Sequence, residues 1–199
     1  MLFKTIILAA LISVATGCAG FRSNQQPFVA PELLQSSNTT KVVVSFNWKA
    51  VQNIDRPVAG TYAKVKDYNE IFEKELVNSG CCIIASKGQQ PDLVINGIVD
   101  LDKNTQTFLE GLVRIPAQYT FAIIPAWYNT YYDLSMTASH INGKNVSYKL
   151  NDHLLTVQWL PLSVLFVIGM DPIKLESKII ENIHRNFIYR LKRNGVLVK

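Results

Sequence analysis

Apolar residues along the chain recur either at alternate positions or at helical spacing. Alternation of apolar and polar residues predicts strands over residues 41–48, 82–85, 92–101, 131–140 and 145–153. Helical spacing predicts two helices, over residues 67–78 and 171–192. The order of these elements predicts an α+β or α/β fold, in which two main helices pack on a mixed β-sheet in a single domain over residues 41–199.

Short sequence signals mark the ends of several of these elements. Asp67 can cap the first helix, and Asp171-Pro172 can begin the last one, because proline fits the first helical position. Asn142-Gly143 lies between two alternating runs, and both residues tolerate the positive φ of a type I′ turn. We therefore expect a β-hairpin across residues 131–153.

Two further apolar segments, residues 111–128 and 154–170, belong to none of these predicted strands and helices. A membrane-spanning helix needs about twenty apolar residues, whereas the second segment has seventeen residues and includes Gln158 and Pro161. One interpretation places both segments in the core, and a spanning helix is a further alternative. Another interpretation leaves them partly exposed, as a patch for lipid or for a protein partner. The candidate contact residues are Phe121, Ile124, Trp127, Trp159, Leu162, Leu165 and Phe166.

The first eighteen residues have the pattern of a secretory signal peptide. Lys4 precedes a short apolar run, and the small residues Ala15-Thr16-Gly17 come immediately before Cys18. This ending resembles the lipobox of bacterial lipoproteins. The resemblance implies cleavage of residues 1–17, a diacylglycerol on the Cys18 sulfur and an acyl chain such as palmitate on the new amine. Alternatives are an ordinary signal peptide with an unrelated cysteine, or an uncleaved anchor.

By the same resemblance, Ala19 after the cysteine implies that the protein is located at the periplasmic face of the outer membrane. Residues 19–40 are polar and turn-prone, so residues 18–40 are predicted to be a lipidated cysteine followed by a flexible tether. Fully extended, such a tether would reach roughly 75 Å. Phe28, Val29, Leu33 and Leu34 could instead dock part of it on the domain.

Composition narrows the partners of the mature chain. Loss of residues 1–17, which include Lys4, lowers the formal net charge from +5 to +4, with no block of like charges. This weak positive charge suits anionic lipid headgroups, and with a periplasmic address it argues against nucleic acid. Two further cysteines, Cys81 and Cys82, are neighbours and are interpreted as small apolar residues at the start of a buried strand. A redox pair or a link to another chain is the alternative.

Residues with catalytic chemistry are few and scattered in the sequence. No nucleophile elbow, His-Glu-x-x-His motif or glycine-rich phosphate loop is present. His140, His153 and His184 have no second metal ligand at a suitable spacing, and Asp100 and Asp102 are interpreted as a solvated strand end. We expect no enzyme activity, no metal and no cofactor beyond the acyl chains on Cys18.

Four short motifs, which lie within residues 124–162, carry a further likeness. Ile124-Pro125-Ala126-Trp127, Tyr132-Asp133-Leu134, Asn142-Gly143-Lys144 and the run from Leu155 to Leu162 resemble a group of small uncharacterised lipoproteins of proteobacterial envelopes. These motifs are structural and imply no catalytic residue. The predicted function is a membrane-anchored scaffold or accessory subunit that binds an envelope protein partner through the apolar patch. The alternative function is a membrane-surface or lipid-binding protein that uses segments 111–128 and 154–170. A hydrolase whose residues converge only in the fold is a third hypothesis.

Overall fold

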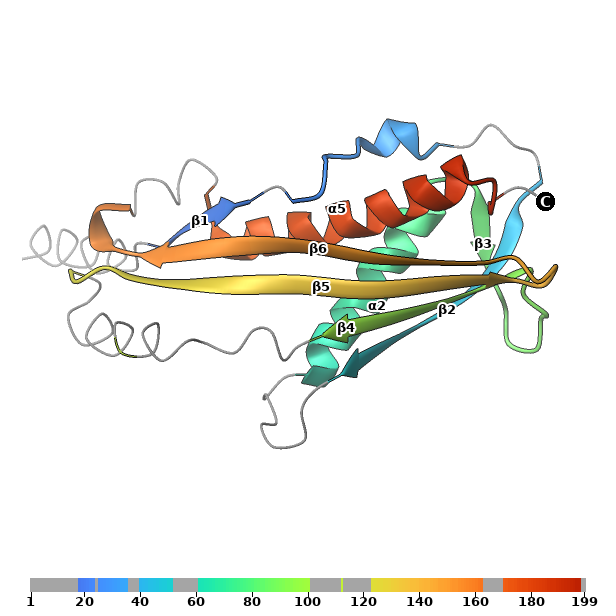
Figure 1. Cartoon of the computed structure of the whole chain (residues 1–199), viewed down its shortest axis with the longest axis horizontal. Coiled ribbons are helices and arrows are strands. Elements are labelled where there is room, and N and C mark those ends of the chain that lie inside the picture. The colour runs from blue at the N-terminus through green and yellow to red at the C-terminus, as the bar shows by residue number, and fades with distance from the viewer. Residues whose placement is uncertain are drawn as a thin grey trace, which may run out of the picture. The chain divides into compact units, whose positions relative to one another are not determined.

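A computed structural model of the chain describes residues 18–23, 25–35, 40–51, 61–100, 112, 123–162 and 170–197. The strands are β1 (Cys18–Arg22), β2 (Val42–Val51), β3 (Cys82–Ile84), β4 (Leu93–Asp100), β5 (Ala126–His140) and β6 (Asn145–Gln158). The α-helices are α2 (Thr61–Asn78) and α5 (Pro172–Arg193), and short 3-10 turns are η1 (Pro31–Leu33) and η3 (Leu160–Leu162). Figure 1 shows these elements.

The strands form one mixed sheet in the order β1-β6-β5-β4-β2-β3. Strand β2 is parallel to both β3 and β4, whereas β4 and β5 are antiparallel, as are β1 and β6. Two helices pack on this sheet, which confirms the predicted α+β class. The Asn142-Gly143 turn joins β5 to β6, and Gly143 has φ of 82°. The predicted hairpin is therefore confirmed, although both strands are longer than predicted.

Some predicted boundaries differ from those in the structure. Helix α2 begins at Thr61, so Asp67 lies within the helix and is not its cap. Helix α5 begins at Pro172 as predicted, and Gly195 follows its end with a positive φ of 64°. In the described residues, no helix is both long and apolar enough to cross a membrane. Much of the two apolar segments lies outside the described residues.

Contacts divide the chain into two compact units. Unit 1 consists of Met1–Ser23, Asn104–Tyr131 and His153–Lys178, and unit 2 consists of Asn24–Lys103, Tyr132–Asp152 and Ile179–Lys199. The core of unit 2 lies between its helices and one face of its strands. Its largest fully buried side chains include Phe72, Leu76, Leu93, Ile95, Leu134, Met136, Ile183 and Phe187.

Alternation along β4 shows how the sequence selects the covered face. Leu93, Ile95 and Val99 are buried, whereas Val94 and Ile98 on the opposite face are exposed. Gly97 occupies a buried position, where an added Cβ would overlap the Trp48 ring. The glycine therefore leaves room for this large side chain to enter the core.

In unit 1, strand β1 is an edge of the sheet. Residues 18–22 pair with residues 154–158 of β6 in antiparallel register, with Cys18 opposite Gln158. On its other side, the Gly20 amide donates to the Met170 carbonyl at 2.8 Å. An added Cβ at Gly20 would lie 2.8 Å from Leu175 Cδ1, so glycine permits this close packing.

In unit 2, residues 25–35 form a strap held by side chains of α5. Asn182 Oδ1 accepts a hydrogen bond from the Val29 amide at 2.9 Å, and Asn182 Nδ2 donates to the Pro27 carbonyl at 3.0 Å. Farther along the helix, Lys192 Nζ donates to the Gln35 carbonyl at 2.7 Å. The strap is thus fixed at both of its ends.

These two segments differ from the flexible tether predicted for residues 18–40. Residues 18–22 form a strand, and residues 25–35 are bonded to α5. Val29 and Leu34 are buried, as the docking alternative expects, whereas Phe28 and Leu33 are exposed. Local sequence suggested flexibility because the partners of both segments lie more than a hundred residues away.

Candidate functional site

Cys18, the predicted lipidation site, is built into the sheet of unit 1. Its neighbour Ala19 is fully buried, and its opposite residue in β6 is Gln158, one residue before Trp159. The Cys18 side chain is half-buried, and burial raises the pKa of its thiol. The structure therefore leaves no linker between the predicted anchor and the first strand.

An exposed apolar surface lies close to this strand end. Trp159 Nε1 donates to the Ile123 carbonyl at 3.2 Å, which joins the residues before β5 to the residue after β6. Ile123 is 65% exposed, Ile124 45%, Trp127 46% and Trp159 38%. We call these four residues the apolar rim. Single exposed apolar residues are ordinary, but four that lie at the adjoining ends of β5 and β6, two of them linked by this hydrogen bond, are typical of an interaction surface.

The predicted contact residues fall into three groups. Ile124, Trp127 and Trp159 are exposed, and Leu162 is half-buried. Phe121, Leu165 and Phe166 lie outside the described residues.

Unit 1 has five further exposed apolar residues that were not among the candidate contact residues. These are Phe21, Leu112, Ile123, Tyr131 and Ile173. Ile123 lay inside a predicted apolar segment, but nothing in the local sequence pointed to Phe21, because β1 itself was not predicted.

Residues considered for catalysis are mostly built into the fold. The Asp152 carboxylate is buried and accepts a hydrogen bond from the Gln25 amide at 3.2 Å. In unit 1, the His153 ring stacks on Tyr131 with 5.5 Å between ring centroids. Asp100 lies opposite Asp133 in the β4–β5 register, while Asp102 lies outside the described residues.

His184 belongs to the core of unit 2 and has an unusual environment. Its fully buried ring packs against Trp48 at 4.9 Å, Phe72 at 5.2 Å and Tyr68 at 6.0 Å between ring centroids. Neither ring nitrogen has a hydrogen-bond partner among the described residues. Because burial penalises the charged ring, the pKa of His184 is lowered from 6.5 to about 3.

Within the residues that the structure covers, no group of three or more His, Cys, Asp or Glu side chains could hold a metal ion.

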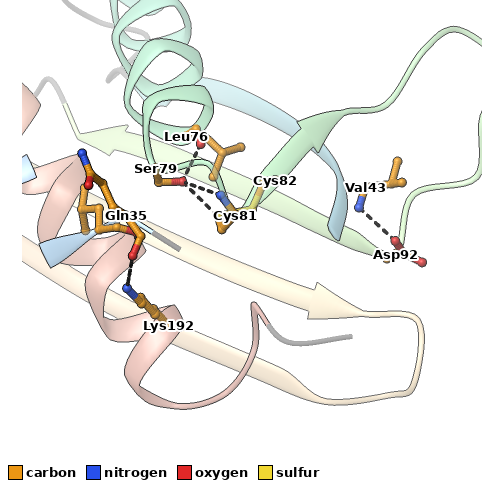
Figure 2. The surroundings of a disulfide bond; sticks show 9 residues. Gln35, Val43, Leu76, Ser79, Cys81, Cys82, Asp92 and Lys192 are labelled. Carbon is orange, nitrogen blue, oxygen red and sulfur yellow. Dashed lines mark hydrogen bonds between the residues drawn. A yellow bond between two sulfur atoms is a disulfide. The ribbon is translucent and has the colours of Figure 1, made fainter. Parts of the chain in front are cut away.

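Cys81 and Cys82 differ from their predicted role as two separate apolar side chains. The structure joins them in a disulfide, and both are buried (Figure 2). Side chains of neighbouring residues in an extended strand point to opposite faces. The pair can bond because β3 begins only at Cys82, which leaves Cys81 in the connection from α2.

Comparisons with known proteins do not assign this site. No protein-family model matches the chain, and no curated protein matches its sequence. The interpretation of the site therefore depends on its geometry and on the predicted lipidation of Cys18.

Proposed function

We propose that this protein is a lipid-anchored, non-enzymatic protein of the outer membrane that rests its apolar rim on the periplasmic membrane surface. The proposal is carried by one observation: Cys18 starts strand β1, opposite Gln158 and one position from Trp159. Acyl chains attached to Cys18 would leave the protein beside this strand end. The rim would then face the bilayer without any intervening tether.

The rim has the chemistry of an interfacial surface. Trp127 and Trp159 combine a large apolar ring with a polar nitrogen, a combination enriched at the boundary between headgroups and acyl chains. Fully burying a large apolar side chain contributes about 1.5–3 kcal/mol. Because the rim residues are roughly half exposed, each can contribute about 1 kcal/mol on entering the membrane.

The free energies of inserting the rim and the acyl chains into the membrane indicate different roles for the two. A total of about 4 kcal/mol for the rim is less than a single myristoyl chain supplies, with its binding constant of about 10⁴ M⁻¹. The acyl chains therefore provide the affinity. The rim selects which surface of unit 1 lies against the lipid.

A protein partner at the same rim is the competing proposal, as expected for a scaffold or accessory subunit of an envelope complex. The adjacent anchor favours the membrane, because lipid meets this strand end whenever Cys18 is acylated. Both proposals assign no catalytic residue.

Flotation with vesicles tests the membrane proposal. A secreted Cys18→Ala form, which carries no lipid, should bind vesicles of phosphatidylethanolamine and phosphatidylglycerol weakly. Replacing both Ile124 and Trp127 with serine removes about 2 kcal/mol and should lower the membrane-binding constant about thirtyfold. The matched control is the double replacement of Val94 and Ile98, two exposed residues of β4, with serine, and it should bind as the parent does.

Two results would contradict the proposal. One is a Cys18→Ala form that does not float at all, and the other is flotation that is equal in the rim and control variants. If the acylated protein instead retains a stoichiometric protein partner in detergent and loses it in the rim variant, the scaffold proposal replaces the membrane proposal.

A further inference from the structure

The Cys81–Cys82 disulfide lies at the joint between α2 and β3 in unit 2. The Cys81 carbonyl accepts a hydrogen bond from the Val42 amide at 3.1 Å, and Cys82 is opposite Val42 in the parallel β2–β3 pair. Both cysteines are only 3% exposed. The bond therefore fixes the position at which the chain passes from a helix into the edge of the sheet.

Ser79 provides a ready hydrogen-bond partner for the reduced form of this pair. Its hydroxyl donates to the Leu76 carbonyl at 2.6 Å, and its Oγ lies 3.0 Å from Cys81 Sγ (Figure 2). In the disulfide, Cys81 Sγ carries no proton. After reduction, the Cys81 thiol can donate to Ser79 Oγ while Ser79 still donates to Leu76. The buried thiol would therefore not be left without a partner, which would be costly.

A cavity adjoins the same serine. It has a volume of about 310 Å³ and is lined by Pro31, Leu34, Gln35, Glu75, Asn78 and Ser79. One wall is thus the end of the strap, and the other is the last turn of α2. Glu75 on this turn is held by Arg185, whose Nε and Nη2 donate to the carboxylate at 2.6 and 2.9 Å.

Breaking the disulfide removes a constraint on the connection between α2 and β3. The bond requires both sulfurs on one side of the chain, whereas an extended strand places neighbouring side chains on opposite faces. Without the bond, the Cys81 side chain can turn away from Cys82 while it stays bonded to the Ser79 hydroxyl. Because Ser79 lines the cavity, such a movement would alter the cavity wall.

We propose that Cys81 and Cys82 form a reversible redox pair that responds to small dithiols and controls the cavity between α2 and the strap. A thiolate of the dithiol attacks the Cys82 sulfur and forms a mixed disulfide, and the Cys81 sulfur leaves as a thiolate that takes up a proton. The second thiol of the reductant then closes its own disulfide and releases Cys82 as a thiol. Two electrons pass from the dithiol to the cysteine pair.

The reductant must be small because the two cysteines are barely exposed. A protein-sized dithiol cannot reach sulfurs in residues that are 3% exposed without displacing the end of α2. The inference concerns unit 2 alone and does not depend on the membrane proposal.

Native reduction with dithiothreitol tests this inference on the Cys18→Ala form, which has no other thiol. Brief treatment at neutral pH should allow two maleimide labels per chain while circular dichroism shows that the protein stays folded. Oxidised dithiothreitol should restore the disulfide. Hydrogen exchange should become faster at residues 76–82 and 31–35 after reduction.

Ser79→Ala provides the specific variant, and Ser86→Ala, at an exposed serine in the same unit, is its control. In mixtures of reduced and oxidised dithiothreitol, Ser79→Ala should shift the equilibrium toward the disulfide about three- to tenfold, and Ser86→Ala should not shift it. The inference is overturned if labelling requires unfolding, if hydrogen exchange is unchanged on reduction, or if Ser79→Ala leaves the equilibrium constant unaltered.

Discussion

Replacing His184 with leucine should remove an acid-sensitive element from the core of unit 2. The imidazole is fully buried among Trp48, Tyr68 and Phe72, and neither nitrogen has a described partner. Its pKa in the folded protein is about 3. In the unfolded chain, the same ring takes up a proton near pH 6.5.

The direction of the pH effect follows from these two values. Because the unfolded state binds the proton more tightly, the free energy of unfolding is unaffected by His184 above pH 6.5 and falls as the pH drops from 6.5 toward 3. Between pH 7 and pH 4.5, the parent protein should lose about 2.5 kcal/mol that a His184→Leu variant keeps.

Urea unfolding at both pH values, followed by circular dichroism, measures this difference. Other groups titrate in both proteins, so the test is the difference between the two pH-induced changes. His184→Phe is a second variant without a titrating group, and it should lose the same pH dependence even if its packing energy differs. If the pH-induced change in the free energy of unfolding differs from that of the parent by less than about 0.5 kcal/mol in both variants, the inference that His184 is buried and neutral is refuted.

Three further substitutions test the packing. Gly20→Val should detach β1, because even a Cβ would lie 2.8 Å from Leu175 Cδ1 and 3.2 Å from Pro172 Cα. Limited proteolysis should then cut the chain near residues 18–23. Unchanged resistance to the protease would contradict the docking of β1. Gly97→Ala should lower the free energy of unfolding by about 1–3 kcal/mol through overlap with the Trp48 ring, and denaturant unfolding measures it; a neutral effect would mean that the ring is not held there. Asn182→Ala should cost about 2–3 kcal/mol and speed hydrogen exchange of the Val29 amide, because one buried and one part-buried hydrogen bond to the strap are lost. The control Asn145→Ala, at an exposed asparagine, should do neither.

Local patterns predicted the elements that depend on neighbouring residues. The alternation in β4 and the Asn142-Gly143 turn carry their signals within a few positions, so both appear in the structure as expected. The apolar stripe of α5 likewise predicted its buried face. That stripe also contained an unused signal, because His184 lies four residues after Ile180 and four before Ile188, at core spacing.

Elements that depend on distant residues could not be predicted in this way. Strand β1 contains no clear alternation, and its partner β6 begins more than a hundred residues later. Gly20 therefore resembled a flexible linker position, although it is the residue that permits close packing on α5. The strap is polar and turn-prone by itself, and the asparagines and lysine that hold it come from the far end of the chain.

The candidate site depends both on local sequence patterns and on contacts between distant residues. Ile124, Trp127 and Trp159 could be chosen from the apolar segments, and all three are exposed. Their relation to Cys18 could not be chosen, because it arises from the pairing of β1 with the last residues of β6. The cysteine pair was interpreted as two apolar side chains, with a redox pair as the alternative. The structure joins the two sulfurs in a disulfide, and Cys81 lies just before β3.

Quenching of tryptophan fluorescence by brominated phospholipids tests membrane contact of the rim most directly. The chain has three tryptophans, so variants that keep one and replace the others with phenylalanine can be reconstituted, acylated on Cys18, into vesicles. We predict strong quenching of Trp127 and Trp159 and none of Trp48, which is 3% exposed and serves as the internal control. Equal, weak quenching of all three would contradict the proposal that the rim lies in the membrane.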